Sequence, residues 1–159
     1  MSKHLPLFLL LLLVVLITNC QKEVIEPEVQ YIESTYFGDC FLSHVQEQEH
    51  IVIRTQAEYE DYFDTKRFRG GNIDCSKAEP TDIDFNSFTL IGTETYGGGC
   101  RVEYSRNIKQ EGNKTLTYYI HARYEGGCMM LIHNMHWVLV PKLKKKTEVV
   151  FEITEEHVI

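Results

Sequence analysis

The chain has 159 residues, 25% of them charged, and a formal net charge of −7 at pH 7. This acidic balance argues against nucleic acid as a partner, because the phosphate backbone attracts positively charged proteins. A chain of this length is expected to form one domain with its own hydrophobic core.

The first segment is an apolar run over residues 5–17, preceded by Lys3 and followed closely by Cys20. A basic end, a short apolar stretch and a small or polar boundary are typical of a secretory signal peptide. The run is too short to cross a bilayer, which takes about 20 apolar residues. We therefore expect residues 1–19 to be a signal peptide, 20–29 a flexible charged tether, and 30–159 a single domain.

The residues that end at Cys20 resemble the lipobox of bacterial lipoproteins, in which the signal peptide is cut just before a cysteine. The resemblance implies that Cys20 becomes the mature N-terminus and carries acyl chains such as palmitate. Asn19 departs from the small residue usual before that cysteine. Two or three chains anchor a protein stably, so we expect a cell-envelope protein attached to the lipid bilayer of the outer membrane. An ordinary signal peptide with an incidental cysteine is the alternative.

The pair Lys22-Glu23 after the lipidated cysteine is similar to a surface-export signal of some Gram-negative lipoproteins. It implies display on the outside of the cell.

Four further cysteines lie in the expected domain, Cys40, Cys75, Cys100 and Cys128. An even number in an exported domain predicts two disulfides, and three pairings are possible. We favour Cys40–Cys75 and Cys100–Cys128. The wide spacing and the lack of a Cys-x-x-Cys motif argue against a redox centre or a zinc knuckle.

Next along the chain, residues 49–54 are predicted to form a strand and residues 55–66 a helix. The segment Thr55-Gln-Ala-Glu58 matches a capping box at the start of that helix. A loop is expected over 70–82. Composition and alternation then predict strands at 88–96, 101–109, 115–124, 136–140 and 149–154.

The strands at 101–109 and 115–124 are predicted to form a hairpin with even-numbered residues on the buried face. A three-residue loop over 111–113 would pair residue 102 with 122, 104 with 120 and 108 with 116. Arg106 would then face inward opposite Tyr118, and Cys100 would lie opposite Tyr124. This register favours a bond from Cys100 to Cys128.

The predicted fold class is α+β, predominantly antiparallel β, with one packed helix near 55–66. We expect a sandwich or roll of about six or seven strands.

Several short motifs occur in a characteristic order: Ile51–Arg54 before the helix, Ile83–Phe85, Tyr96–Gly99, and His136–Lys142. In this order, over roughly residues 50–143, the chain resembles the C-terminal domain of the protease-complex subunit PrcB. The resemblance implies a non-catalytic exported lipoprotein that associates with or stabilises a surface protease. The family has no catalytic residues to carry over, and the four cysteines are a departure from it.

Two glycine-rich segments flanked by tyrosines form the candidate binding site. Disulfide-pinned loops are pre-organised, and tyrosine is enriched at binding hot spots. The residues of this candidate glycine rim are Tyr96, Gly97, Gly98, Gly99, Tyr124, Glu125, Gly126 and Gly127.

Other polar clusters are expected to be structural. His133 and His136 lie three apart beside the strand predicted at 136–140, and positions three apart in a strand point to opposite faces, which argues against a metal site. Asp82 and Asp84 are expected to cap a turn, with an ion site as the alternative. Lysines 142, 144, 145 and 146 are expected in a solvated turn, with contact to anionic lipid or an acidic partner as the alternative.

These features together predict a membrane-anchored cell-envelope lipoprotein that acts as a non-catalytic protein-binding or protease-accessory module. We expect no enzymatic activity, no metal and no cofactor. A small-ligand or glycan-binding lipoprotein using the glycine rim is one alternative. A metal-dependent hydrolase using the histidines or the aspartates is the other.

Overall fold

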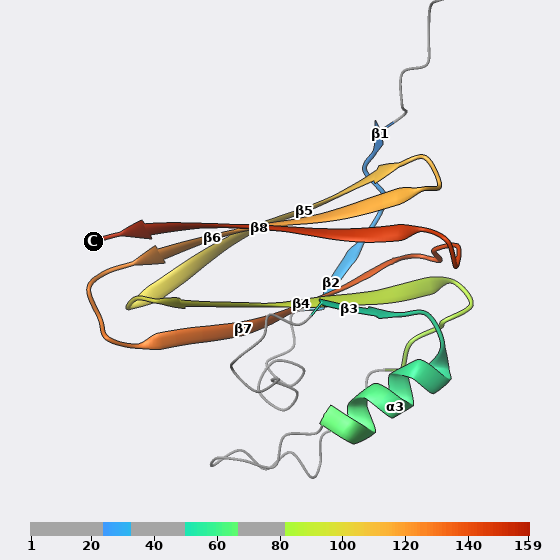
Figure 1. Ribbon diagram of the computed structural model, residues 1–159, viewed down its shortest axis with the longest axis horizontal. Helices are drawn as coiled ribbons and strands as arrows, with labels where there is room; N and C mark the ends of the chain where they lie inside the picture. The colour runs from blue at the N-terminus through green and yellow to red at the C-terminus, as the bar shows by residue number, and fades with distance from the viewer. Residues whose placement is uncertain (1–23, 33–49, 67–81) are drawn as a thin grey trace, which may run out of the picture.

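The computed structural model describes residues 24–32, 50–66 and 82–159. In these ranges two four-stranded sheets lie face to face, and a helix lies against the outer face of one of them (Figure 1). The strand order is β1-β5-β6-β8 in the first sheet, called sheet A, and β2-β7-β4-β3 in the second, called sheet B. The predicted α+β, mostly antiparallel class is confirmed.

Sheet A contains β1 (Val24–Ile25), β5 (Arg101–Glu111), β6 (Thr115–Glu125) and β8 (Glu148–Val158). Sheet B contains β2 (Gln30–Ile32), β3 (His50–Ile53), β4 (Phe88–Gly98) and β7 (Leu131–Pro141). The helix is α3 (Gln56–Lys66). Across these three described ranges, no helix has the length and apolar character needed to cross a membrane.

A first core fills the space between the two sheets. Ile91, Val138 and Val140 of sheet B face Leu116 and Ile120 of sheet A, and all five are buried. The even-numbered residues of β6 point inward, as the alternation in its sequence predicts. The packing of two inner sheet faces makes this part of the molecule a sandwich.

A second core lies on the other face of sheet B, where α3 packs. Leu90 and Trp137 of the sheet meet Tyr59 and Phe63 of the helix, and all four are buried. Strand β4 is therefore covered on both faces. This explains why its sequence, Phe88–Gly92, is a continuous apolar or small run without alternation.

The predicted capping box at α3 is confirmed. The Thr55 hydroxyl accepts from the Glu58 amide at 3.2 Å, and the Glu58 carboxylate accepts from the Thr55 amide at 3.2 Å. The same carboxylate accepts from the Arg54 amide at 2.6 Å. These bonds satisfy amide groups that the first helical turn leaves without partners.

The predicted hairpin forms, but its predicted register is wrong by two residues. Val102 pairs with Tyr124, and Ile108 pairs with Tyr118. The loop still has three residues, but they are 112–114, because Gly112 adopts a positive φ of 56° that glycine tolerates. An even shift leaves every side chain on its predicted face.

Arg106 faces inward as predicted, but it lies opposite Ile120 and not Tyr118. Its guanidinium lies 4.6 Å from the centre of the Tyr31 ring, at the edge of the core. The shifted register also places Arg101 opposite Glu125, so Cys100 no longer lies opposite Tyr124.

Strand β8 is parallel to β6, with Thr115 beside Glu148 and Glu125 beside Val158. The chain leaves sheet A after β6, runs through β7 in sheet B, and returns to sheet A. A parallel neighbour in sheet A follows from this double crossing.

Part of the predicted tether, 20–29, belongs to the sandwich. Val24 and Ile25 form β1, which pairs with Glu111 and Gln110 at the end of β5. The free backbone groups along the edge of β5 provide this pairing. The expectation of a flexible tether is thus corrected at these two residues.

The sandwich has two distinct ends (Figure 1). The β4–β5 and β6–β7 connections and the end of β8 lie at one end, called the disulfide end. The β5–β6 and β7–β8 turns lie at the other, called the turn end, and β1 lies there too.

Candidate functional site

At the disulfide end, the two connections between the sheets are joined by a bond from Cys100 to Cys128, with a Cα–Cα distance of 4.9 Å. The predicted pairing of these two cysteines is confirmed. The proposed lipid-attachment residue Cys20 and the predicted Cys40–Cys75 pair lie outside the described residues. The disulfide brings the two predicted glycine segments together.

Backbone hydrogen bonds reinforce this closure. The Gly99 amide donates to the Met130 carbonyl at 3.1 Å, and the Cys100 amide donates to the Glu125 carbonyl at 2.7 Å. Gly126 has a φ of 82°, and a Cβ there would lie 2.7 Å from the Cys100 sulfur. Gly126 is therefore required both by the backbone conformation and by the disulfide beside it.

Tyr124 is not part of an exposed rim, which corrects the prediction. Its side chain points into the sandwich and is 1% exposed. Its ring lies against Gly97 and stacks on His157 at a centroid distance of 5.1 Å. Burial raises the pKa of the Tyr124 hydroxyl well above its usual range. Tyr124 therefore packs inside the sandwich against Gly97 and does not offer a contact surface.

Tyr96 is 45% exposed, so its ring is accessible from solvent. It lies on the outer face of sheet B, opposite His133. Gly97 is buried, whereas Gly98, Gly126 and Gly127 are exposed.

Three exposed apolar residues outside the predicted glycine rim follow the disulfide. Met129 is fully exposed, and 51% of Met130 and 58% of Leu131 are exposed. Leu131 lies opposite Gly98, two positions along from Tyr96 on the same sheet. The sequence signal was the apolar run Cys128-Met-Met-Leu-Ile132 directly after two glycines. We call Tyr96, Met129, Met130 and Leu131 the apolar patch.

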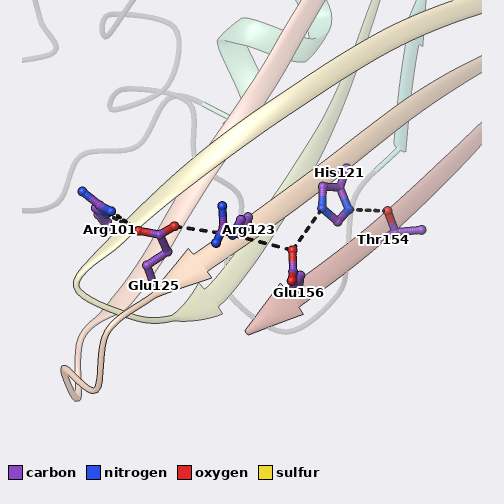
Figure 2. A network of polar contacts seen from close by, with 6 residues as sticks. All are labelled: Arg101, His121, Arg123, Glu125, Thr154 and Glu156. Atoms are coloured by element: carbon purple, nitrogen blue, oxygen red, sulfur yellow. Dashed lines mark hydrogen bonds and ion pairs between the residues drawn. The ribbon is translucent and has the colours of Figure 1, made fainter. Parts of the chain in front are cut away.

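A charged network covers the outer face of sheet A at the same end (Figure 2). The Glu125 carboxylate contacts Arg101 and also Arg123, the latter at 3.4 Å. Glu156 on β8 lies 3.7 Å from Arg123 and 3.8 Å from His121. Glu125, predicted as a rim residue, is therefore occupied in holding β5 and β6 together.

His121 links the network to Thr154, with its Nδ1 3.0 Å from the hydroxyl (Figure 2). These exposed contacts join β5, β6 and β8 across the sheet. Single exposed ion pairs contribute little to stability, so their main effect is to fix side-chain positions on this face.

A polar cluster lies inside the sandwich near the disulfide end. The Thr95 hydroxyl is 2.8 Å from His136 Nε2 and 3.2 Å from the Tyr104 hydroxyl, which also accepts from Asn134 at 2.7 Å. A hydroxyl beside an imidazole resembles a nucleophile with its base. Thr95 is 0% and His136 4% exposed, however, so a substrate reaches neither group unless the sheets separate.

The two histidines of the hydrolase alternative are on opposite faces of β7, as predicted. His133 Nε2 lies 3.7 Å from the buried Glu94 carboxylate on the outer face of sheet B. His136 faces the inner polar cluster. In the part of the chain that the structure describes, no group of three or more histidine, cysteine or acidic side chains is placed to hold a metal ion.

Asp84 caps a turn, as expected. Its carboxylate accepts from the Ser87 hydroxyl at 2.6 Å and from the Asn86 amide at 3.0 Å, and these bonds lower the pKa of Asp84. Asp82 and Asp84 line an open cleft of about 640 Å³ beside the start of α3. Lys142 also lines this cleft, and its ammonium donates to the Arg54 and Phe85 carbonyls, both at 2.6 Å.

A smaller hollow of about 180 Å³ lies on the outer face of sheet A. An aromatic ring, Tyr119, stands among polar groups in its lining. Lys109 lies over this ring, 5.6 Å from its centre. The other side chains of interest in the lining are Ser105, Asn107, His121, Glu152 and Thr154.

No family model matches this chain, and no curated protein or solved structure matches it either.

Proposed function

We propose that this protein is a cell-envelope lipoprotein, anchored through acylated Cys20, that binds another envelope protein without catalysing a reaction. The proposed contact surface is the apolar patch. The observation that carries the proposal is that four large apolar side chains are exposed at the end of sheet B, in or beside the connections tied together by Cys100–Cys128.

The energetics favour use of the patch as an interface. Grouped exposed apolar side chains mark binding sites in soluble domains, and their burial is favourable by about 25 cal/mol per Å². Methionine adapts its shape to a partner because it is unbranched. The disulfide and the bonds from Gly99 and Cys100 hold the backbone in place before binding, which lowers the entropy lost on association.

A surface protease is the partner class that the motif order implies, with this protein as an accessory subunit. The proposal assigns no catalytic residue to the chain. The buried position of Thr95 and His136 is consistent with a structural role for that polar pair.

The test is in-cell crosslinking and affinity capture of the tagged lipoprotein, with partners identified by mass spectrometry. The variant Tyr96→Ser/Met130→Ser/Leu131→Ser is compared with the wild type. We expect one dominant envelope partner and at least a roughly tenfold loss of its capture in the variant, since central apolar anchors dominate interface energetics.

The control is Val24→Ser, which removes an exposed apolar residue away from the patch and is expected to leave capture unchanged. Capture that survives the patch variant but is lost in the control would contradict the proposed surface. Recovery of the bait alone, under conditions that crosslink a known complex, would contradict a protein partner.

The hollow on sheet A supports a second candidate function, the binding of a sugar. A ring-shaped apolar surface, Tyr119, beside hydrogen-bonding groups such as Asn107 and Glu152 suits a ligand with one apolar face and many hydroxyls. A thermal-shift screen of glycans would test it. A rise in melting temperature with a glycan that is lost in Tyr119→Ser would support this function. An unchanged melting temperature with every glycan would contradict it.

A further inference from the structure

The turn end of the sandwich carries a cluster of basic side chains. Lys114 lies in the β5–β6 turn, and Lys144, Lys145 and Lys146 lie in the β7–β8 turn, all exposed. We infer that these four lysines dock the domain on the anionic headgroup surface of the bilayer that holds acylated Cys20. The inference rests on the proposed lipid anchor and adds an orientation to it.

The two lysine-bearing turns form one surface. The Glu148 amide donates to the Lys114 carbonyl at 2.8 Å, and the Thr147 hydroxyl donates to the Asn113 carbonyl at 3.2 Å. The two turns are thus joined by one backbone–backbone hydrogen bond and one side chain–backbone hydrogen bond, which hold their charges close together. The acids nearest to these lysines in sequence are Glu111 and Glu148, and Glu26 follows β1 at the same end, so four lysines outnumber these three carboxylates.

Lys142 is not part of this surface, because its ammonium donates to the Arg54 and Phe85 carbonyls. The basic run in the sequence is therefore divided by the fold. One lysine ties the turn to the segment before α3, and three project into solvent.

The described chain begins at the same end as the lysines. Val24 pairs with Glu111, the residue that directly precedes the Gly112 turn. Cys20 is four residues before Val24, a distance of at most roughly 14 Å in extended chain. The acylated residue therefore keeps the turn end close to the lipid headgroups, near the range of about 8–10 Å over which charges interact at physiological salt.

The negative charge of the rest of the molecule means that this contact orients the domain on the membrane. The chain carries a net −7, so an anionic bilayer repels most of its surface while attracting the lysine cluster. Each lysine near an anionic membrane strengthens binding about fivefold. The apolar patch lies at the opposite end, roughly 33 Å away along β6, and is far from the membrane in this orientation.

The experiment uses the mature acylated protein in vesicles of phosphatidylcholine alone and of phosphatidylcholine mixed with phosphatidylglycerol. The reactivity of each lysine toward an amine-acylating reagent is measured by mass spectrometry. We expect Lys114 and Lys144–Lys146 to be protected several-fold by phosphatidylglycerol, and Lys109 on the outer face of sheet A to keep its reactivity. Equal reactivity of all five lysines in both vesicles would overturn the inference.

A second variant tests whether the lysines of the two turns bind the headgroups together or only lie near them. In Lys144→Gln/Lys145→Gln/Lys146→Gln, Lys114 serves as the reporter, and its protection by phosphatidylglycerol is expected to fall. Full protection of Lys114 in this variant would overturn a joint docking surface. The lipid anchor is tested separately by flotation with the vesicles. A protein that floats with neither vesicle contradicts acylation at Cys20 and not lysine docking.

Discussion

Gly97 and Gly98 are neighbours in β4 with opposite surroundings. Gly97 points into the sandwich, where a Cβ would overlap the Tyr124 ring, whereas a Cβ on Gly98 would have no atom within 4 Å. Neither position has a positive φ. The two glycines therefore separate the effect of close packing from that of backbone freedom.

We predict that Gly97→Ala lowers the free energy of unfolding by about 1–3 kcal/mol, because the added methyl group must displace the buried ring. Gly98→Ala, the matched control, is expected to change it by less than about 0.5 kcal/mol. Urea denaturation followed by circular dichroism measures both. Equal effects of the two substitutions would show that the ring does not pack as described.

At the scale of the element, α3 depends on its cap and its aromatic face. Most of its other positions hold Asp, Glu or Lys, and it packs on sheet B through Tyr59 and Phe63. The rings of Tyr62 and Phe63 contact Trp137. A helix of 11 residues is marginal alone, so tertiary packing supplies most of its stability.

We predict that Thr55→Ala destabilises the protein by about 1 kcal/mol, since it removes the acceptor for the Glu58 amide. Gln56→Ala, one residue on, loses only an exposed pair with Glu60 and should change stability by about 0.5 kcal/mol or less. Trp137 is the only tryptophan in the chain and lies beneath α3, so its fluorescence reports the unfolding midpoint. An unchanged midpoint for Thr55→Ala would exclude a stabilising cap.

At the scale of the whole molecule, the disulfide joins the two crossings between sheets A and B at one end. Its cysteines are separated by 28 residues. Closing a loop of this length restricts the unfolded chain by roughly 3–4 kcal/mol in the chain-entropy account. The sandwich and the apolar patch thus depend on the same bond.

We predict that Cys100→Ala/Cys128→Ala lowers the free energy of unfolding by up to about 3–4 kcal/mol and weakens partner capture even where the domain stays folded. The double variant is preferable to a reducing agent, because a reducing agent would also break any other disulfide. Chemical denaturation and crosslinking capture are measured on the same samples. Full capture by a destabilised variant would show that the disulfide does not pre-organise the patch.

Much of the fold follows from local patterns. The alternation in Thr115–Tyr124 identified the buried face of β6, and Thr55 with Glu58 identified the start of α3. These signals are local, since a strand repeats every two residues and a helix cap spans four. The Cys100–Cys128 pairing could also be predicted, because a hairpin brings its two ends together whatever its exact register.

Only the tertiary structure decided the strand register, the exposure of the site residues, and the placement of the apolar patch and the lysines at opposite ends of the sandwich. A shift of two residues keeps the buried face, so the alternation could not distinguish the predicted pairing from the one formed. Tyr96 and Tyr124 both flank glycines in the sequence, but Tyr96 lies on an outer face and Tyr124 between the sheets. Which face a strand turns to its neighbour depends on how the sheets stack, and so does the placement of β1 and the lysines opposite the apolar patch.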